Sequence, residues 1–286
     1  FDLTVVGDLP AALDGVYLRN GPNPVSGESD HWFLGDGMVH GVRLNKGKAD
    51  WYRARYIQTP LLNGGGSMIP TPTEHQANTS VVHHAGRLFC LAEIGFPYEI
   101  SASDLSTIGP HDFAGQLKGA FTAHPKLDPV TGEMLFFGYD FLSPTITYHR
   151  VDPEGLLTKS EVIELPKAIM MHDFQVTPTH VVFMDLPILF DIDLAIAGEG
   201  FPFRWAPENG ARIGVMPREG TADDLVWFAI DACYVFHTFN AFHDAEDPNV
   251  IHLACVRYQE MWDAGANDFT ATQSLQRYEP SLTTET

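Results

Sequence analysis

Residues 169–187 read IMMHDFQVTPTHVVFMDLP, and this stretch carries the pattern that decides the fold. A short apolar segment ends at the turn residues 177–179, and a run of β-branched and aromatic residues follows. That pattern is typical of two β-strands joined by a tight turn. His172 stands at the edge of the apolar sequence. Taken alone, it is either a core histidine with one satisfied hydrogen bond or a metal ligand.

A similar unit precedes this one in the chain. Residues 122–141 read TAHPKLDPVTGEMLFFGYDF, again an apolar strand, a tight turn and a second apolar strand. Units of this kind start at His124, His172 and His237, at intervals of 48 and 65 residues. A four-stranded propeller blade takes roughly 40–50 residues. Because the innermost strands of all blades converge on the propeller axis, we expect the three imidazoles to meet there.

The rest of the chain supports an all-β fold. Strand-like segments occur at 80–93, 134–141, 179–187, 225–230 and 250–258, and 20 prolines and 25 glycines break the chain into turns. Amphipathic helical windows are scarce, which favours a barrel, sandwich or propeller. We expect one propeller domain over residues 1–286. Residues 187–205 interrupt the pattern and predict a loop or short helix that forms a cap insertion.

Composition excludes several functions. The net charge is −20 and no basic stripe is present, so a nucleic-acid partner is not expected. The sequence has no apolar run of 18 residues, which predicts no membrane-spanning helix. Cys90, Cys233 and Cys255 form no metal-binding spacing, and each is expected to be a small buried residue of a reduced, cytoplasmic protein.

Most of the 13 histidines are expected to have structural or surface roles. His243 lies six residues after His237, but residues six apart in a strand are roughly 20 Å apart. We therefore expect His243 to be a loop residue outside any shared metal site. The glycine run NGGGS at 63–67 has no strand–turn–helix context and is interpreted as a turn.

Six ordered blocks carry a specific resemblance. They are LDGVYLRNGPNP (13–24), WFLGDGMVHGVRL (32–44), ANTSVVHHAGRLFCLAEIGFPYEI (77–100), TAHPKLDPVTGEMLFFGYDF (122–141), MMHDFQVTPTHVVFMDLP (170–187) and CYVFHTFNAFHD (233–244). Together they resemble the carotenoid cleavage oxygenase family, which includes apocarotenoid and lignostilbene dioxygenases. The bacterial apocarotenoid type is the most similar.

The resemblance implies a seven-bladed β-propeller with a loop and helix cap, in which four axial histidines hold one Fe(II). His124, His172 and His237 match three of them. The fourth lies near the C-terminus of family members, beyond a segment like SLQRYEPSL (274–282), and is not in this sequence. We therefore expect the propeller to be incomplete here, with its C-terminal blades absent. Neutral imidazoles suit Fe(II), and open positions serve O2.

The resemblance also implies roles around the metal. Glu93 matches a glutamate that orients a ligand and should orient His172. Thr79 matches a residue that crowds one open iron position, and Phe236 matches an aromatic residue lining the substrate tunnel. Ala92 stands where hydroxystilbene-cleaving enzymes have a lysine, which favours a long apolar polyene.

The expected function is a non-haem Fe(II) dioxygenase that cleaves one C=C bond of an apocarotenoid with O2 to give two carbonyl products. Three alternatives stay open: a stilbene-cleaving dioxygenase, a catalytically inactive binding module without its fourth histidine, and a three-histidine zinc hydrolase. Residues 190–205 are a candidate patch for peripheral membrane contact, with Phe201 and Phe203 at its centre.

Overall fold

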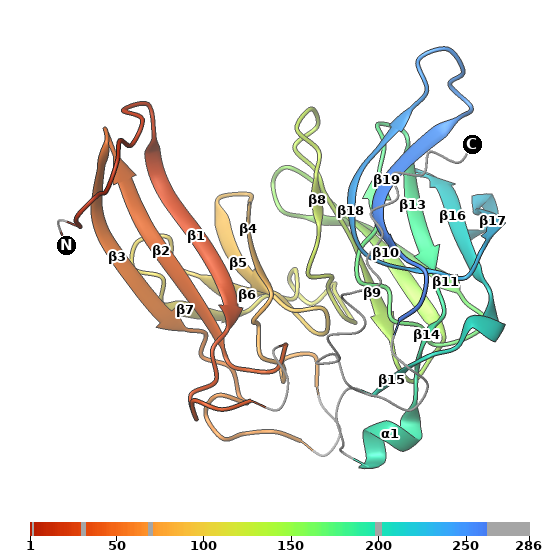
Figure 1. The fold of residues 1–286 in the computed structure, drawn as a ribbon, viewed down its shortest axis with the longest axis horizontal. Coiled ribbons are helices and arrows are strands. Elements are labelled where there is room, and N and C mark those ends of the chain that lie inside the picture. Colours follow the sequence, from red (N-terminus) through yellow and green to blue (C-terminus); the bar gives the residue numbers. More distant parts are fainter. Residues whose placement is uncertain (2, 30–32, 68–70, 198–201, 262–286) are drawn as a thin grey trace. The chain divides into compact units, whose positions relative to one another are not determined.

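The computed structural model describes residues 1, 3–29, 33–67, 71–197 and 202–261, and these residues form almost only β-strands (Figure 1). The chain divides into two compact units. The first unit consists of residues 1–123 and 152–157, and the second consists of residues 124–151 and the chain from residue 158 onward. All five segments expected to be strands contain strands, so the predicted all-β class is confirmed. No helix among the described residues is long and apolar enough to cross a membrane.

The first unit contains two antiparallel sheets. One has the order β1 (Asp14–Pro22), β2 (Gly37–Asn45), β3 (Lys48–Tyr56). The other has the order β4 (Ser80–His84), β5 (Arg87–Leu91), β6 (Tyr98–Ile100), β7 (Thr107–Pro110). The two-residue loop Ala85–Gly86 joins β4 to β5 with both residues at positive φ, 48° and 74°. That geometry matches the right-handed twist of a hairpin.

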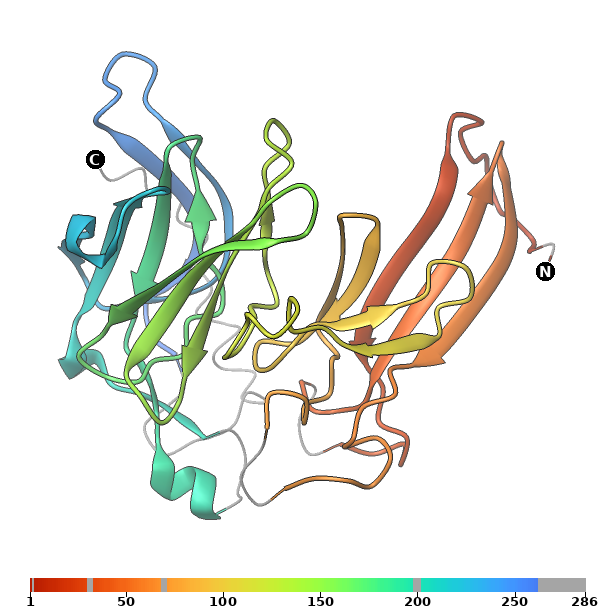
Figure 2. The same cartoon turned by 180° about the vertical axis from the view of Figure 1, so that it is seen from behind.

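The second unit contains two four-stranded sheets. Its first sheet consists of β8 (Lys126–Leu127), β9 (Met134–Asp140), β10 (Thr145–Val151) and β11 (Leu157–Glu164), in the order β11-β10-β9-β8 (Figure 2). Its second consists of β12 (Gln175–Val176), β13 (His180–Asp185), β16 (Ala211–Pro217) and β17 (Val226–Ile230). Strands that pair with their neighbours in chain order are the form of propeller blades.

A two-stranded sheet follows, made of β18 (Tyr234–His243) and β19 (Ile251–Tyr258). Two short 3₁₀ helices, Pro207–Asn209 and Ala222–Asp224, flank β16. The core of the unit lies between its sheets, where the Phe174 ring meets Phe137 at 5.2 Å and Phe183 at 6.4 Å between centroids. All three rings are fully buried, so the segment leading into β12 is anchored by apolar packing.

The insertion between β13 and β16 is more ordered than a loop. It contains β14 (Ile188–Phe190), α1 (Ile192–Ala197) and β15 (Phe203–Trp205), and β14 pairs with β15. The Phe203 ring lies 5.4 Å from that of Phe141 and is buried, because the pairing turns it inward. The expectation that Phe203 faces a membrane is therefore wrong, and Phe201 lies outside the described residues. The cap role stays a prediction.

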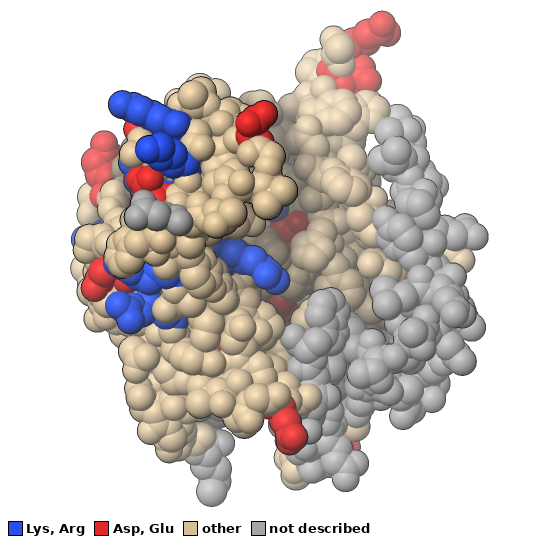
Figure 3. All heavy atoms as spheres, turned by 60° about the vertical axis from the view of Figure 1, so that its left-hand side comes forward, with Lys and Arg blue, Asp and Glu red and all other residues tan. Residues whose placement is uncertain are grey.

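The face drawn in Figure 3 shows no long basic stripe. Its basic groups lie in separate clusters with acidic side chains beside them.

The prediction that all three cysteines are buried holds for two of them. Cys90 and Cys233 are buried, whereas Cys255 on β19 is half-buried, and all three are free thiols.

Candidate metal centre

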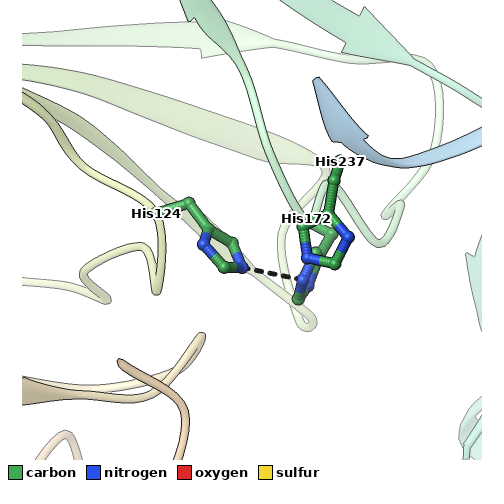
Figure 4. Close-up of side chains that lie close together, drawn as sticks. All are labelled: His124, His172 and His237. Carbon is green, nitrogen blue, oxygen red and sulfur yellow. Dashed lines mark hydrogen bonds between the residues drawn. The ribbon is translucent and has the colours of Figure 1, made fainter. Parts of the chain in front are cut away.

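Three histidines of the second unit meet at one point. His124, His172 and His237 each offer a ligand atom, and these atoms lie within 4.8 Å of one another (Figure 4). The ring centroids are 4.6 Å apart for His124 and His172, and 5.1 and 5.0 Å from them to His237. Within the described part of the chain, this is the group of His, Cys, Asp and Glu side chains whose geometry suits a metal ion.

The chain delivers the three histidines from equivalent places. His124 comes just before β8 and His172 just before β12, and both of these strands begin their sheets in chain order and lie at a sheet edge. His237 lies in β18, the first strand of the next sheet, where the register shifts twice, between Val235 and Thr238 and again between Thr238 and Asn240. Such irregularities bend a strand and redirect a side chain. The predicted convergence is therefore found.

The centre favours neutral imidazoles. Burial, followed by the neighbouring His172 imidazole, lowers the pKa of His124 to about 3, against an opposing influence of Asp173. The Nε2 atoms of His124 and His172 lie 2.9 Å apart, so one ring donates a proton that the other accepts. Neutral imidazole nitrogen is the form that binds a metal.

Aromatic side chains border the centre. The Phe236 ring lies 5.5 Å from the His172 ring, and it contacts Tyr234 at 4.8 Å and Tyr258 at 6.0 Å between centroids. Phe236 is half-buried, so it presents apolar surface next to the histidines. Its predicted role as a tunnel residue stays a prediction.

Thr79 and Glu93 belong to the first unit. The Thr79 backbone N–H donates to the Leu91 carbonyl at 2.8 Å, which extends the β4–β5 ladder and places Thr79 and Glu93 at the same end of this hairpin. Thr79 is exposed, Glu93 is half-buried and Ala92 is buried. The roles expected of Thr79 and Glu93 at the metal stay predictions.

His243 was expected in a loop, and this is wrong: it is the last residue of β18. The reason is that β19 pairs along the whole strand, with His243 opposite Ile251. Its Nε2 bonds the hydroxyls of Thr177 and Thr179 at 3.0 and 2.9 Å, and its Nδ1 bonds the Pro248 carbonyl. It is therefore engaged away from the three-histidine cluster.

Sequence reasoning missed Asp173, which directly follows His172. Its carboxylate is 2% exposed and accepts hydrogen bonds from Lys126 Nζ at 2.7 Å and from the Thr238 hydroxyl at 2.7 Å. Burial disfavours ionisation of Asp173, but the Lys126 ammonium and the Thr238 donors outweigh it and lower the carboxyl pKa. An acidic residue inside an apolar stretch was the available signal.

The fold and this centre define an all-β protein with a three-histidine cluster suited to a divalent metal. The chain belongs to the retinal pigment epithelial membrane protein family, whose model matches residues 1–285. The resemblance inferred from the six sequence blocks is thereby confirmed, because similar curated proteins include carotenoid cleavage oxygenases.

Three known proteins illustrate the likeness. A carotenoid cleavage oxygenase of Mycobacterium tuberculosis is 40% identical over 92% of this chain and 62% of its own length. The crystal structure of Pseudomonas brassicacearum lignostilbene dioxygenase matches with a TM-score of 0.77 and 32% identity, covering 90% of this chain and 63% of that one. Cobalt-substituted Synechocystis apocarotenoid oxygenase matches with a TM-score of 0.79 and 26% identity, covering 95% and 63%. The chain thus spans less than two thirds of these relatives.

Proposed function

We propose that this chain carries the metal-binding part of a non-haem Fe(II) dioxygenase that cleaves one C=C bond of an apocarotenoid to give two carbonyl products. The observation that carries the proposal is the convergence of His124, His172 and His237 within 4.8 Å. The metal would supply O2 activation, which no side chain can provide. Cobalt in the Synechocystis relative supports a divalent metal in this family.

The residues of the chain have separate tasks in this proposal. The three imidazoles hold the metal through neutral nitrogens, and Glu93 fixes the orientation of His172. Thr79 narrows one open position, and Phe236 offers an apolar wall along which a polyene lies.

The substrate class is inferred from the aromatic rings beside the histidines and from the residue type at position 92 of the first unit. Phe236, Tyr234 and Tyr258 form a cluster of aromatic rings beside the histidines. Ala92 is buried and offers no polar contact for a phenol. Both features favour a long apolar polyene. A stilbene is the second candidate, because the Pseudomonas lignostilbene dioxygenase is 32% identical.

Membrane contact is proposed only through α1. Ile192 is 51% exposed and Ile196 is 78% exposed, four residues apart on one helix face. These two side chains give a small exposed apolar surface on α1. Replacing both isoleucines with serine should reduce binding to liposomes without changing metal content; unchanged liposome binding removes this proposal.

Metal analysis combined with a substrate comparison tests the proposed function. In a protein in which a fourth histidine completes the site, we expect about one iron per chain, and O2-dependent cleavage of apocarotenals faster than that of hydroxystilbenes. His172→Ala should lose iron and activity, whereas His243→Gln, a histidine outside the cluster, should retain both. Zinc in place of iron would favour a hydrolase, and a wild-type protein without metal would favour an inactive binding module.

A further inference from the structure

A single buried carboxylate connects the segments that carry all three histidines. Asp173 Oδ1 accepts from Lys126 Nζ at 2.7 Å and from the Phe174 backbone N–H at 2.8 Å. Its Oδ2 accepts from the Thr238 backbone N–H at 2.9 Å and from the Thr238 hydroxyl at 2.7 Å. The carboxylate is 2% exposed, so these bonds are shielded from water.

Each partner is a close neighbour of a different histidine. Lys126 is two residues after His124, Asp173 is one residue after His172, and Thr238 is one residue after His237. Consecutive Cα atoms are about 3.8 Å apart, so a bond at these partners restrains the neighbouring histidine backbone. Asp173 therefore joins three segments that are distant in the sequence, and it does so within two residues of each histidine.

The sheets themselves hold these positions weakly. β8 pairs with β9 through only two residues, Lys126 and Leu127, and β12 pairs with β13 through only Gln175 and Val176. β18 is irregular on both sides of Thr238. Few ladder hydrogen bonds fix β8 and β12 next to their histidines, and the bonds of Asp173 to Lys126 and Thr238 join the three segments there.

A stabilising role alone does not explain a carboxylate at this place. Burying a charge is costly, and apolar replacements of buried ion pairs are often as stable or more stable. A buried ion pair is more useful for fixing one arrangement among several. We infer that Asp173 is a positioning residue that holds His124, His172 and His237 in the arrangement that binds the metal, an inference that rests on the proposed function.

Cobalt titration tests this inference on the purified protein. Co(II) reports both affinity, through the dissociation constant, and ligand geometry, through its visible absorption bands. Asp173→Asn keeps the size of the side chain but removes the charge that Lys126 needs. We expect Co(II) binding to weaken about tenfold or more, the range seen when residues behind metal ligands are replaced, and the absorption bands to shift.

Asp185→Asn is the matched control. Asp185 is also a buried carboxylate of the second unit, 4% exposed, and it pairs with Arg212 at 2.7 Å, but it has no bond to a histidine-bearing segment. We expect this variant to be less stable and to bind Co(II) within about twofold of wild type. Equal weakening of Co(II) binding in both variants would overturn the inference, because the effect would then come from general destabilisation.

Three further substitutions keep the test valid if Asp173→Asn does not fold. Lys126→Met removes the ammonium and should weaken Co(II) binding, whereas Lys126→Arg keeps the charge and should restore most of the affinity. Thr238→Val removes one hydroxyl bond and should have a smaller effect in the same direction. The positioning role would be overturned if folded Asp173→Asn bound Co(II) with wild-type affinity and spectrum. The same result in both Lys126→Met and Thr238→Val would also overturn it, and the metal centre itself would not be affected.

The proposed function fails in a different way. If the wild-type protein binds neither Fe(II) nor Co(II), the metal centre itself is refuted and the role of Asp173 with it. If the wild-type protein binds metal and the Asp173 and Lys126 variants bind it equally well, the metal centre stands and only the positioning role is refuted.

Discussion

The Nε2 atoms of His124 and His172 lie 2.9 Å apart, although 48 residues separate them in the chain. A metal bound by both Nε2 atoms would take the place of the proton between them, which would move to the Nδ1 of the same ring. Protonation of the imidazoles in acid competes with the metal for these nitrogens. Metal binding at this centre is therefore expected to be stronger at neutral pH than in acid.

Removing the metal should lower the stability of the protein. A ligand that binds only the folded state stabilises it by about 2.7 kcal/mol at a free concentration 100 times its dissociation constant. We expect chelation to lower the thermal midpoint of the wild-type protein by several degrees, as measured by calorimetry. His172→Ala should show no such chelator effect; a chelator shift of wild-type size in this variant would contradict the ligand assignment.

Phe236 should affect the substrate and leave the metal in place. Its ring contacts the His172 ring and two tyrosines but offers no ligand atom. Phe236→Ala is expected to raise KM for an apocarotenal about tenfold, since burying an aromatic side chain against a substrate contributes on the order of 1–3 kcal/mol. Iron content should stay within the error of wild type. Loss of iron in Phe236→Ala would show that the ring supports the metal centre instead.

Two buried histidines should make the protein acid-sensitive. Burial lowers the pKa of His75 to about 4 against the opposing Phe96 carbonyl, and burial likewise lowers the pKa of His149 to about 4. In the unfolded chain both titrate near 6.5, so below that pH the unfolded state binds more protons than the folded state. Stability is therefore complete above about pH 6.5 and falls as the pH drops toward 4, by on the order of 3 kcal/mol for each histidine.

Urea unfolding at pH 7 and pH 5 measures this effect. His75→Gln should be less stable at pH 7, because the His75 bonds to the Phe96 carbonyl and the Ala77 N–H are altered, but its stability should change less between the two pH values. His40→Gln, at an exposed hydrogen bond to Tyr52, is the control and should keep the wild-type pH dependence. An unchanged pH dependence in His75→Gln would contradict the prediction.

Gly95 should tolerate no side chain. Its φ is +91°, and a Cβ there would collide with the Pro72 carbonyl oxygen and the buried His75 ring. Gly95→Ala is expected to reduce the free energy of unfolding by about 3 kcal/mol, through backbone strain and overpacking. Gly15→Ala is the control, because an added Cβ at Gly15 meets open space. It should lie within about 0.5 kcal/mol of wild type.

The meeting of the three histidines was largely predictable from the sequence because these residues repeat with the strands. His124, His172 and His237 occupy equivalent places at the start of successive sheets, so their spacing alone predicted that they meet. Asp173 was not predictable in this way. Its role depends on which side chains reach it from two other sheets, and sequence periodicity carries no information on such long-range contacts.

The errors have related causes. His243 was placed in a loop because a residue six positions from His237 in one strand is too far away to share a metal with it, yet pairing with β19 extends the strand to this residue. Phe203 was included in the candidate membrane patch because residues 190–205 are rich in apolar side chains, yet its pairing partner Phe190 and the Phe141 ring enclose it. In both cases a tertiary partner decided the environment of the residue.

The direct pairing of β13 with β16 makes the second four-stranded sheet independent of what lies between these strands. Asp185 and Arg212 face each other across the ladder, so the segment from one to the other leaves and re-enters the sheet at neighbouring points. Residues around α1 can therefore change in length and composition while the register of the strands stays the same. β14 is constrained, because its backbone bonds that of residues 168–170, just before His172.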